Sequence, residues 1–147
     1  LLSSAKLARG HNTKVAFCPS DPSVISQHKD KIHNLFEYID ILILNEIEAS
    51  TLYPGLPLEK TLNNIAAKFE AGALTLGPDG AYGYKNEQIE RIAGPKISQS
   101  DIINTNGAGD AFAGGFLCAY LKHGDIQYSL KKGQNHAIDV LKKEAAR

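Results

Sequence analysis

The apolar run Ile41-Leu42-Ile43-Leu44 restricts the fold more than any other stretch of this chain. Four large aliphatic residues follow one another, whereas a strand with one face in water would alternate apolar and polar residues. Such a run is typical of a central parallel strand that is covered on both faces, and parallel strands need crossover connections that are usually helices. The run therefore indicates an α/β domain.

Helical and extended patterns alternate along the rest of the chain. Apolar spacing predicts helices over residues 1–8, 30–40, 58–70 and about 126–143, the last with an interruption at Gly133. Strands are expected over residues 13–18 and 73–76, and residues 81–84 and 89–92 are typical of a hairpin. Residues 20–23 are expected to form a turn, with Asp21 extended before Pro22. This order predicts a mostly parallel sheet flanked by helices, with a late antiparallel hairpin.

Composition narrows the class of protein and of partner. The 147 residues carry 16 basic and 16 acidic side chains and are 43% apolar, which favours a globular domain and gives no reason to expect nucleic acid or a membrane as partner. Cys18 and Cys118 form no CxxC pair, so we expect reduced thiols in a cytoplasmic protein. The histidines include no i, i+4 pair, which disfavours a zinc site. Because the chain lacks methionine and starts in a helical pattern, we interpret it as the C-terminal part of a longer protein.

The stretch Asn104-Thr105-Asn106-Gly107-Ala108-Gly109-Asp110 is a glycine-rich turn that leads into an apolar run. The apolar residues from Phe112 to Leu121 have helical spacing, so the turn is expected to be a helix N-terminus. Such an end offers unpaired N–H groups and a partial positive charge, which suit a phosphoryl group. Two glycines let the backbone approach a ligand closely, and Asp110 would lie beside that anion site.

Two more polar clusters follow predicted strands. Asn45-Glu46-Ile47-Glu48 comes directly after the apolar run, and Thr75-Leu76-Gly77-Pro78-Asp79-Gly80 ends the next strand. Open α/β sheets bind ligands at the carboxyl ends of their strands, so the three clusters could converge at one edge. Each also has a structural interpretation: the two glutamates as first-turn acids of a helix, and the glycines as a simple turn.

Familiar nucleotide and hydrolase signatures are absent. No GxxxxGK[ST] sequence occurs, GxGxxG fails because Phe112 stands at the third glycine, and there is no GxSxG elbow.

The three clusters resemble a known family when taken together. The second signature of the ribokinase-like (PfkB) carbohydrate and nucleoside kinases, written DTxGAGDxFxGG, is similar to the run from Asn106 to Phe116. The NxxE motif of that family resembles Asn45 to Glu48, and its TxGxxG motif resembles Thr75 to Gly80. The resemblance covers residues 1–147 as the C-terminal nucleotide-binding and catalytic part of a ribokinase-like α/β domain. It implies that the N-terminal half, with a β-sheet lid, is absent.

The resemblance implies a role for each motif residue. Asp110 would be the general base, and the backbone N–H groups of Gly107, Ala108 and Gly109 would form the anion hole. Asn45 and Glu48 would hold Mg²⁺ through water, and the residues lining the phosphates of ATP would be Thr75, Gly77 and Gly80. The last helix, with Gly133, Asn135 and His136, resembles the wall beside the adenine, although for His136 a solvated or packed helix histidine is the favoured interpretation.

One residue departs from the family pattern. Asn104 stands where the family usually has an aspartate that is associated with a monovalent-cation site. Asparagine keeps a carbonyl oxygen but lacks the charge, so a K⁺ requirement at Asn104 is left open. Asp21-Pro22 and Asn106 favour an adenosine-kinase-like member over ribokinase.

The function expected from this resemblance is ATP-dependent phosphotransfer to a hydroxyl of a sugar or nucleoside. A homodimer would form through the missing lid, and the fragment alone is expected to be inactive because water exclusion and substrate orientation need the lid. The alternatives are a non-catalytic nucleotide-binding fragment or degenerate homologue, and a purely structural α/β domain.

Overall fold

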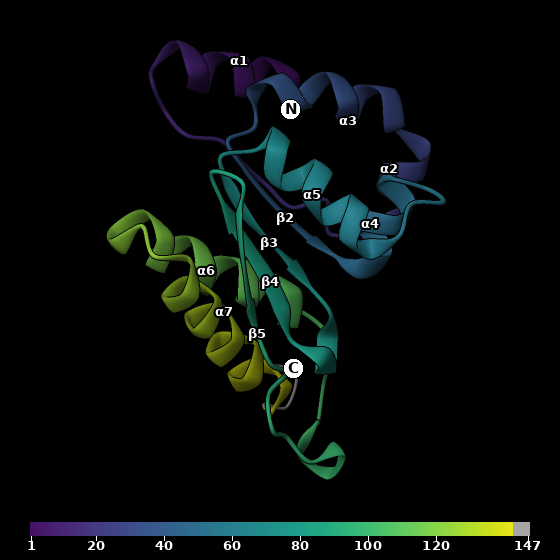
Figure 1. Ribbon diagram of the computed structural model, residues 1–147, viewed down its shortest axis with the longest axis vertical. Helices are drawn as coiled ribbons and strands as arrows, with labels where there is room; N and C mark the ends of the chain where they lie inside the picture. The colour runs from purple at the N-terminus through teal and green to yellow at the C-terminus, as the bar shows by residue number, and fades with distance from the viewer. Residues whose placement is uncertain (143–147) are drawn as a thin grey trace. The chain divides into compact units, whose positions relative to one another are not determined.

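The computed structural model describes residues 1–142, which fall into two compact units. The first unit comprises residues 1–75 and 84–89, and the second comprises residues 76–83 together with the chain from Glu90 onward. The elements of the first unit are, in order, α1 (Leu2–Gly10), β1 (Ala16–Phe17), α2 (Pro22–Gln27), α3 (Lys29–Leu35), the 3₁₀ helix η1 (Phe36–Tyr38), β2 (Ile41–Asn45), α4 (Glu46–Leu52), α5 (Leu58–Lys68) and β3 (Ala71–Thr75) (Figure 1).

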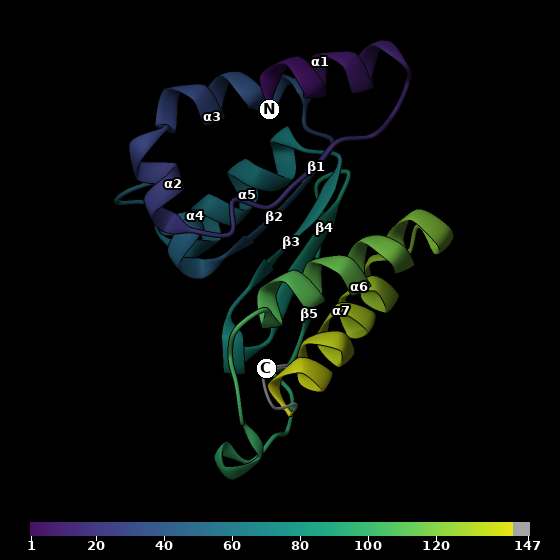
Figure 2. The same ribbon diagram turned by 180° about the vertical axis from the view of Figure 1, so that it is seen from behind.

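The second unit holds the last two long helices. Its elements are η2 (Gly77–Asp79), η3 (Gln99–Asp101), α6 (Ala108–His123) and α7 (Ile126–Leu141), and the strands β4 (Ala81–Lys85) and β5 (Gln88–Ile92) are divided between the two units. Helices α6 and α7 run side by side along most of their length (Figures 1 and 2).

The five strands form one sheet in the order β1-β2-β3-β4-β5. β1 pairs with β2, and β2 with β3, in parallel, and the latter register runs from Ile41 opposite Ala71 to Asn45 opposite Thr75. β4 and β5 are joined through Asn86 and Glu87, whose φ angles of 47° and 69° are those of a tight hairpin turn. The prediction of a mostly parallel sheet with a late antiparallel hairpin is confirmed.

Side-chain caps account for two helices that the sequence patterns did not predict. Asp21 is extended, as expected, but its carboxylate accepts a hydrogen bond from the Ser23 N–H and so begins α2 where only a turn was predicted. This bond also lowers the pKa of Asp21. The short helix α4 begins at Asn45 in the same way. Both helices span two turns or fewer, so they contain too few residues for a periodic pattern.

Other element boundaries also differ from the prediction. The expected strand over residues 13–18 is reduced to β1, and the helix over residues 30–40 is divided into α3 and η1. The prediction that Gly133 interrupts the last helix was wrong, since α7 continues through it. The absence of a side chain at this position instead lets the backbone of Phe112 approach closely. The predicted helix end at Lys143 lies outside the described residues.

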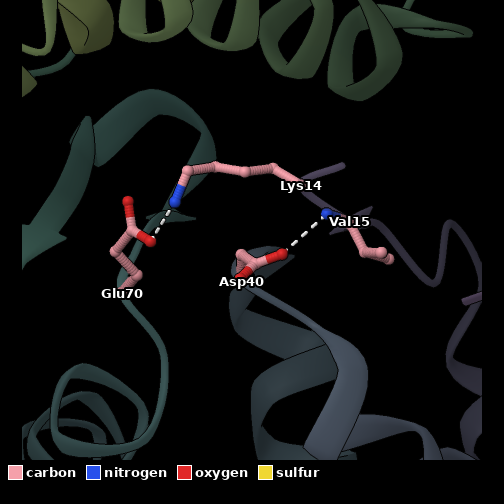
Figure 3. Close-up of polar contacts among 4 residues, drawn as sticks. All are labelled: Lys14, Val15, Asp40 and Glu70. Atoms are coloured by element: carbon pink, nitrogen blue, oxygen red, sulfur yellow. Dashed lines mark hydrogen bonds and ion pairs between the residues drawn. The ribbon is translucent and has the colours of Figure 1, made fainter. Parts of the chain in front are cut away.

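Polar contacts hold the amino ends of the three parallel strands together. The Val15 N–H donates to Asp40 Oδ2 at 2.8 Å, and the Lys14 ammonium pairs with the Glu70 carboxylate (Figure 3). Asp40 directly precedes β2 and Glu70 directly precedes β3, so residues 14 and 15 fasten the start of β1 to both strands. These contacts lie at the amino ends of the strands, so the carboxyl ends of β2 and β3, at Asn45 and Thr75, are not involved in them.

The core of the first unit is built around one buried tyrosine. β2 and β3 are almost entirely buried, and α4 and α5 pack against them. The end of the Tyr84 side chain lies over Gly72, and its hydroxyl donates a hydrogen bond to the Leu42 carbonyl oxygen at 2.8 Å. Burial raises the pKa of Tyr84 well above its ordinary value, so the hydroxyl keeps the proton that it donates.

Two further predictions from composition can be compared with the structure. Within residues 1–142, no helix is both long enough and apolar enough to span a membrane. Cys18 and Cys118 are not joined in a disulfide.

Gly72 leaves no space for a side chain, and this yields a stability prediction. A Cβ on Gly72 would lie 1.9 Å from the Leu42 carbonyl oxygen and 2.3 Å from the Tyr84 hydroxyl oxygen. We expect Gly72→Ala to lower the free energy of unfolding by about 1–3 kcal/mol or more, measured by urea denaturation. Gly10→Ala is the control, since a Cβ there meets nothing within 4 Å. Equal stability of the two variants would contradict this packing.

Candidate active site

The end of β2 and the start of α4 form a reciprocal capping box. Asn45 Oδ1 accepts a hydrogen bond from the Glu48 N–H at 2.8 Å, and Glu48 Oε2 accepts one from the Asn45 N–H at 2.9 Å. Glu48 is only 4% exposed, whereas Glu46 is exposed. The structural interpretation of Glu48 as a first-turn acid is therefore confirmed, and its carboxylate is held in a single orientation.

The same pair retains chemistry suited to a hydrated cation. Carboxylate and amide oxygens are hard ligands, and Mg²⁺ usually keeps several waters and takes only one or two protein carboxylates. Among the described residues, no group of three or more His, Cys, Asp or Glu side chains could enclose a metal ion. The capping bonds use one acceptor position on Asn45 Oδ1 and one on Glu48 Oε2, and a hydrated cation would need only hydrogen bonds from its waters to the positions that remain, so these residues fit a water-mediated contact.

Thr75 lies beside the capping box. It is the last residue of β3 and the register partner of Asn45, the last residue of β2. The parallel pairing thus brings the NxxE cluster and the first residue of the TxGxxG cluster together at the carboxyl edge of the first unit, as the sequence predicted.

The rest of the TxGxxG cluster forms a tight turn in the second unit. The Leu76 N–H donates to the Gly80 carbonyl oxygen at 2.8 Å, and Gly77 and Gly80 have φ angles of +57° and +100°. A Cβ on Gly80 would lie 2.1 Å from the Ile92 carbonyl oxygen, whereas one on Gly77 would meet nothing within 4 Å. Gly80 is therefore required by packing, and Gly77 by its backbone conformation alone.

The glycine-rich turn begins α6 without a side-chain cap. Gly107 is the N-cap residue, with φ +78°, and Asp110 is exposed in the first turn. A Cβ on Gly107 or Gly109 would meet nothing within 4 Å, so packing does not explain the small residue at position 109. First-turn amides without a side-chain acceptor, beside open space, suit an anion.

Asn104 belongs to this turn. Its Oδ1 accepts a hydrogen bond from the Asn106 N–H at 2.9 Å. The carbonyl oxygen that was considered for a monovalent cation thus serves the local turn, and a K⁺ site at Asn104 stays a prediction.

Stacked aromatic rings anchor α6 behind the turn. Phe112, Phe116 and Tyr120 are buried, and successive ring centroids are 6.3 Å and 6.0 Å apart. Leu121 belongs to the predicted apolar spacing but is 65% exposed, because it lies on the opposite side of the helix from these rings. The position of Asp110 at the start of α6 is therefore set by a packed helix.

Three residues of α7, Gly133, Asn135 and His136, were singled out as the wall beside the adenine, and Gly133 is buried. Asn135 is exposed. His136 packs its ring against α6, where Cδ2 would lie 2.5 Å from a Cβ on Gly115. His136 is nevertheless exposed, which agrees with its interpretation as a solvated or packed helix histidine.

Comparison with known proteins decides the family. The sequence pattern of the pfkB family of carbohydrate kinases matches residues 2–147. The chain belongs to this family. Among curated relatives, it is 30% identical to adenosine kinase of Dictyostelium discoideum over 85% of this chain and 40% of the relative. It is also 30% identical to ribokinase of Haemophilus influenzae, over 97% of this chain and 46% of the relative.

Solved structures of kinases have the same fold as this pfkB-family chain. A probable sugar kinase from Rhizobium etli superposes with a TM-score of 0.88 at 28% identity, over 97% of this chain and 43% of the other. Adenosine kinase from Sinorhizobium meliloti superposes with a TM-score of 0.88 at 25% identity, over 96% and 43%. The chain thus spans less than half the length of the relatives and structures named here.

Sequence reasoning did not identify two residues that support the turns. The Gln134 side-chain amide donates to the Ala93 carbonyl oxygen at 2.8 Å, and a Cβ on Gly94 would lie 1.6 Å from the Pro78 carbonyl oxygen. These contacts join residues far apart in the chain, so no local pattern marks them. Gly94, however, lies two residues after a predicted strand, and this position near the strand end was the one signal that the sequence offered.

The capping box predicts different effects for two substitutions of Glu48. Gln at this position retains an acceptor for the Asn45 N–H, so Glu48→Gln should change the free energy of unfolding by less than about 0.5 kcal/mol. Glu48→Ala removes the acceptor and should cost about 1–2 kcal/mol. Urea denaturation of the two variants tests this. A loss in Glu48→Gln as large as that in Glu48→Ala would contradict the capping role.

Proposed function

We propose that this chain is the nucleotide-binding and catalytic part of a kinase that transfers a phosphoryl group from ATP to a hydroxyl of a sugar or nucleoside. The observation that carries the proposal is the start of α6. Its N-cap residue, Gly107, provides no side-chain cap, and Asp110 is exposed in the first turn. Membership of the pfkB family supports the reaction class. Relatives named adenosine kinase, cytidine kinase and ribokinase support a nucleoside or sugar as acceptor.

In this proposal Asp110 is the general base. The acceptor hydroxyl oxygen forms a bond to the γ-phosphorus while the bond from that phosphorus to the β–γ bridging oxygen breaks. Asp110 takes the hydroxyl proton, and ADP leaves. The N–H groups of Gly107, Ala108 and Gly109 would donate to the charge that develops on the transferred group, and the Ala108 N–H would leave its 3.4 Å bond to the Thr105 carbonyl oxygen to do so.

The remaining residues of the motifs are proposed to hold the nucleotide. Thr75, Gly77 and Gly80 line the phosphates, and Asn135 stands beside the base. Asn45 and Glu48 orient Mg²⁺ through water, in keeping with their engagement in the capping box. When bound, Mg²⁺ neutralises phosphate charge.

The activity of the whole protein is also a proposal, because the chain spans 40–49% of the length of these curated relatives. We propose that a further part of the protein covers the acceptor and makes the contacts of a homodimer. Without such a cover, water exclusion and substrate orientation are incomplete, so phosphotransfer by the 147-residue chain should be weak or absent.

The second candidate function is a nucleotide-binding module without catalysis. The engagement of the Asn104 carbonyl oxygen within the turn favours it, since a cation at that position would have to compete with the Asn106 N–H. Binding of ATP with Mg²⁺ in the absence of transfer to adenosine, cytidine or ribose would support the module.

Asp110→Asn tests the general base. We expect phosphotransfer to fall by about 10²- to 10⁴-fold while ATP binding is retained, because the amide cannot accept the hydroxyl proton. Asp30→Asn, which removes an exposed acid from α3, is the control and should leave the rate unchanged. Rates come from ADP release and binding from calorimetry. Near-normal turnover of Asp110→Asn would exclude the assignment.

Glu48→Gln tests the magnesium contact. This variant keeps the helix cap but lacks the negative charge, so the Mg²⁺ concentration that gives half-maximal ATP binding should rise by about threefold to tenfold. Titration of Mg²⁺ at constant ATP measures this value. An unchanged requirement, together with unchanged stability, would leave Glu48 as a helix cap only.

A further inference from the structure

Helix α7 contacts the supports of both glycine turns of the second unit. The contacts are made by two adjacent residues, Gly133 and Gln134. Gly133 lies against α6, and Gln134 reaches the segment that follows β5. The two turns are therefore linked through a single turn of one helix.

The contact of Gly133 is with the backbone of α6. A Cβ on Gly133 would lie 2.8 Å from the Phe112 carbonyl oxygen and 3.1 Å from two atoms of the Phe112 ring. Phe112 follows Asp110 by two residues and is buried, so its backbone cannot move without moving the first turn of α6. The absence of a side chain at position 133 thus sets how closely that turn approaches α7.

The contact of Gln134 is with the segment on which the other turn rests. Its side-chain amide donates to the Ala93 carbonyl oxygen at 2.8 Å. The Ala93 carbonyl carbon would lie 2.7 Å from a Cβ on Gly80, so the turn and the segment pack backbone against backbone. A shift of Ala93 is therefore passed to the Gly77–Gly80 turn.

The carboxyl end of α7 adds a third contact. The Leu141 carbonyl oxygen accepts hydrogen bonds from the Ile103 N–H at 2.8 Å and the Asn104 N–H at 3.4 Å. These amides lie just before Gly107, so α7 holds the glycine-rich turn from both sides.

We propose that Gly133 and Gln134 are positioning residues that together fix the Gly107–Asp110 turn relative to the Gly77–Gly80 turn. Neither residue needs to touch the ligand, because each acts through a neighbouring backbone. The proposal rests on the proposed function in one respect: both turns are taken to bind phosphate groups of the same nucleotide.

The test compares variants of the 147-residue chain by NMR. Gln134→Met keeps the side-chain length and helix propensity but lacks the amide donor. Gly133→Ala introduces a clash with Phe112. Gln127→Met, the control, makes the same chemical change elsewhere on α7. Residual dipolar couplings of the backbone amides report the orientation of each turn relative to the other. We expect a changed orientation in Gln134→Met and Gly133→Ala and the wild-type orientation in Gln127→Met.

A second readout asks whether this orientation matters for an anion. Inorganic phosphate is titrated while the Gly109 and Asp110 amide shifts are followed, and binding should weaken about threefold to tenfold in Gln134→Met and Gly133→Ala. Gln127→Met should bind phosphate as the wild type does. A general loss of folding would instead lower the amide dispersion of the whole chain.

The outcomes separate this proposal from the proposed function. The wild-type orientation in Gln134→Met, or an equal change in Gln127→Met, overturns the positioning role, and Gln134→Met decides it even where Gly133→Ala does not fold. A changed orientation with unchanged phosphate affinity also overturns it. If the wild-type amides do not respond to phosphate, the anion hole of the proposed function fails, while the couplings still decide whether α7 orients the turns.

Discussion

The parallel pairing of β2 with β3 is the interaction on which the first unit depends. The strands are in register from their first residues to Asn45 and Thr75, so the side chains that follow the buried segments are neighbours at one edge. Gly72 makes this pairing compatible with the core, because it lets the Tyr84 hydroxyl cross β3 and bond to Leu42 on β2. The polar contacts of Lys14 and Val15 hold the other ends of the strands. The motif residues therefore stand on a rigid support.

Helix N-termini are treated in two ways in this chain, and the difference bears on function. α2, α4 and α7 begin with Asp21, Asn45 and Asp125, whose side chains accept first-turn N–H groups. α1, α3, α5 and α6 have no side-chain cap, and of these four only α6 begins at a glycine, Gly107, beside open space. A side-chain cap occupies one of the first amides of a helix, whereas the first-turn amides of α6 have no side-chain acceptor and lie beside glycines that leave room for an anion. The glycine start of α6 supports the proposal that a phosphoryl group binds there.

Much of this arrangement could be predicted from local patterns. The run from Ile41 to Leu44 indicated a buried parallel strand, and Gly107 followed by apolar residues indicated a helix N-terminus, since each signal lies within one element. The short helix α2 was missed because two turns hold too few apolar residues for a period, although Asp21 before Pro22 was a capping signal. The start of α4 was indicated only by its two glutamates as first-turn acids. Gly133 was taken for a helix break because glycine weakens a helix locally, whereas here it admits the backbone of Phe112.

What the sequence by itself determined is the α/β class, the family motifs and the residue types available for phosphoryl transfer, because spacing and chemistry are local properties of the chain. Only the tertiary structure decided which glycines are required by packing and which by backbone conformation, and that Gln134 holds the Ala93 carbonyl. These outcomes depend on contacts between residues up to 41 positions apart. Such contacts exist only after the chain has folded, and most of them join residues too far apart for a local pattern to mark.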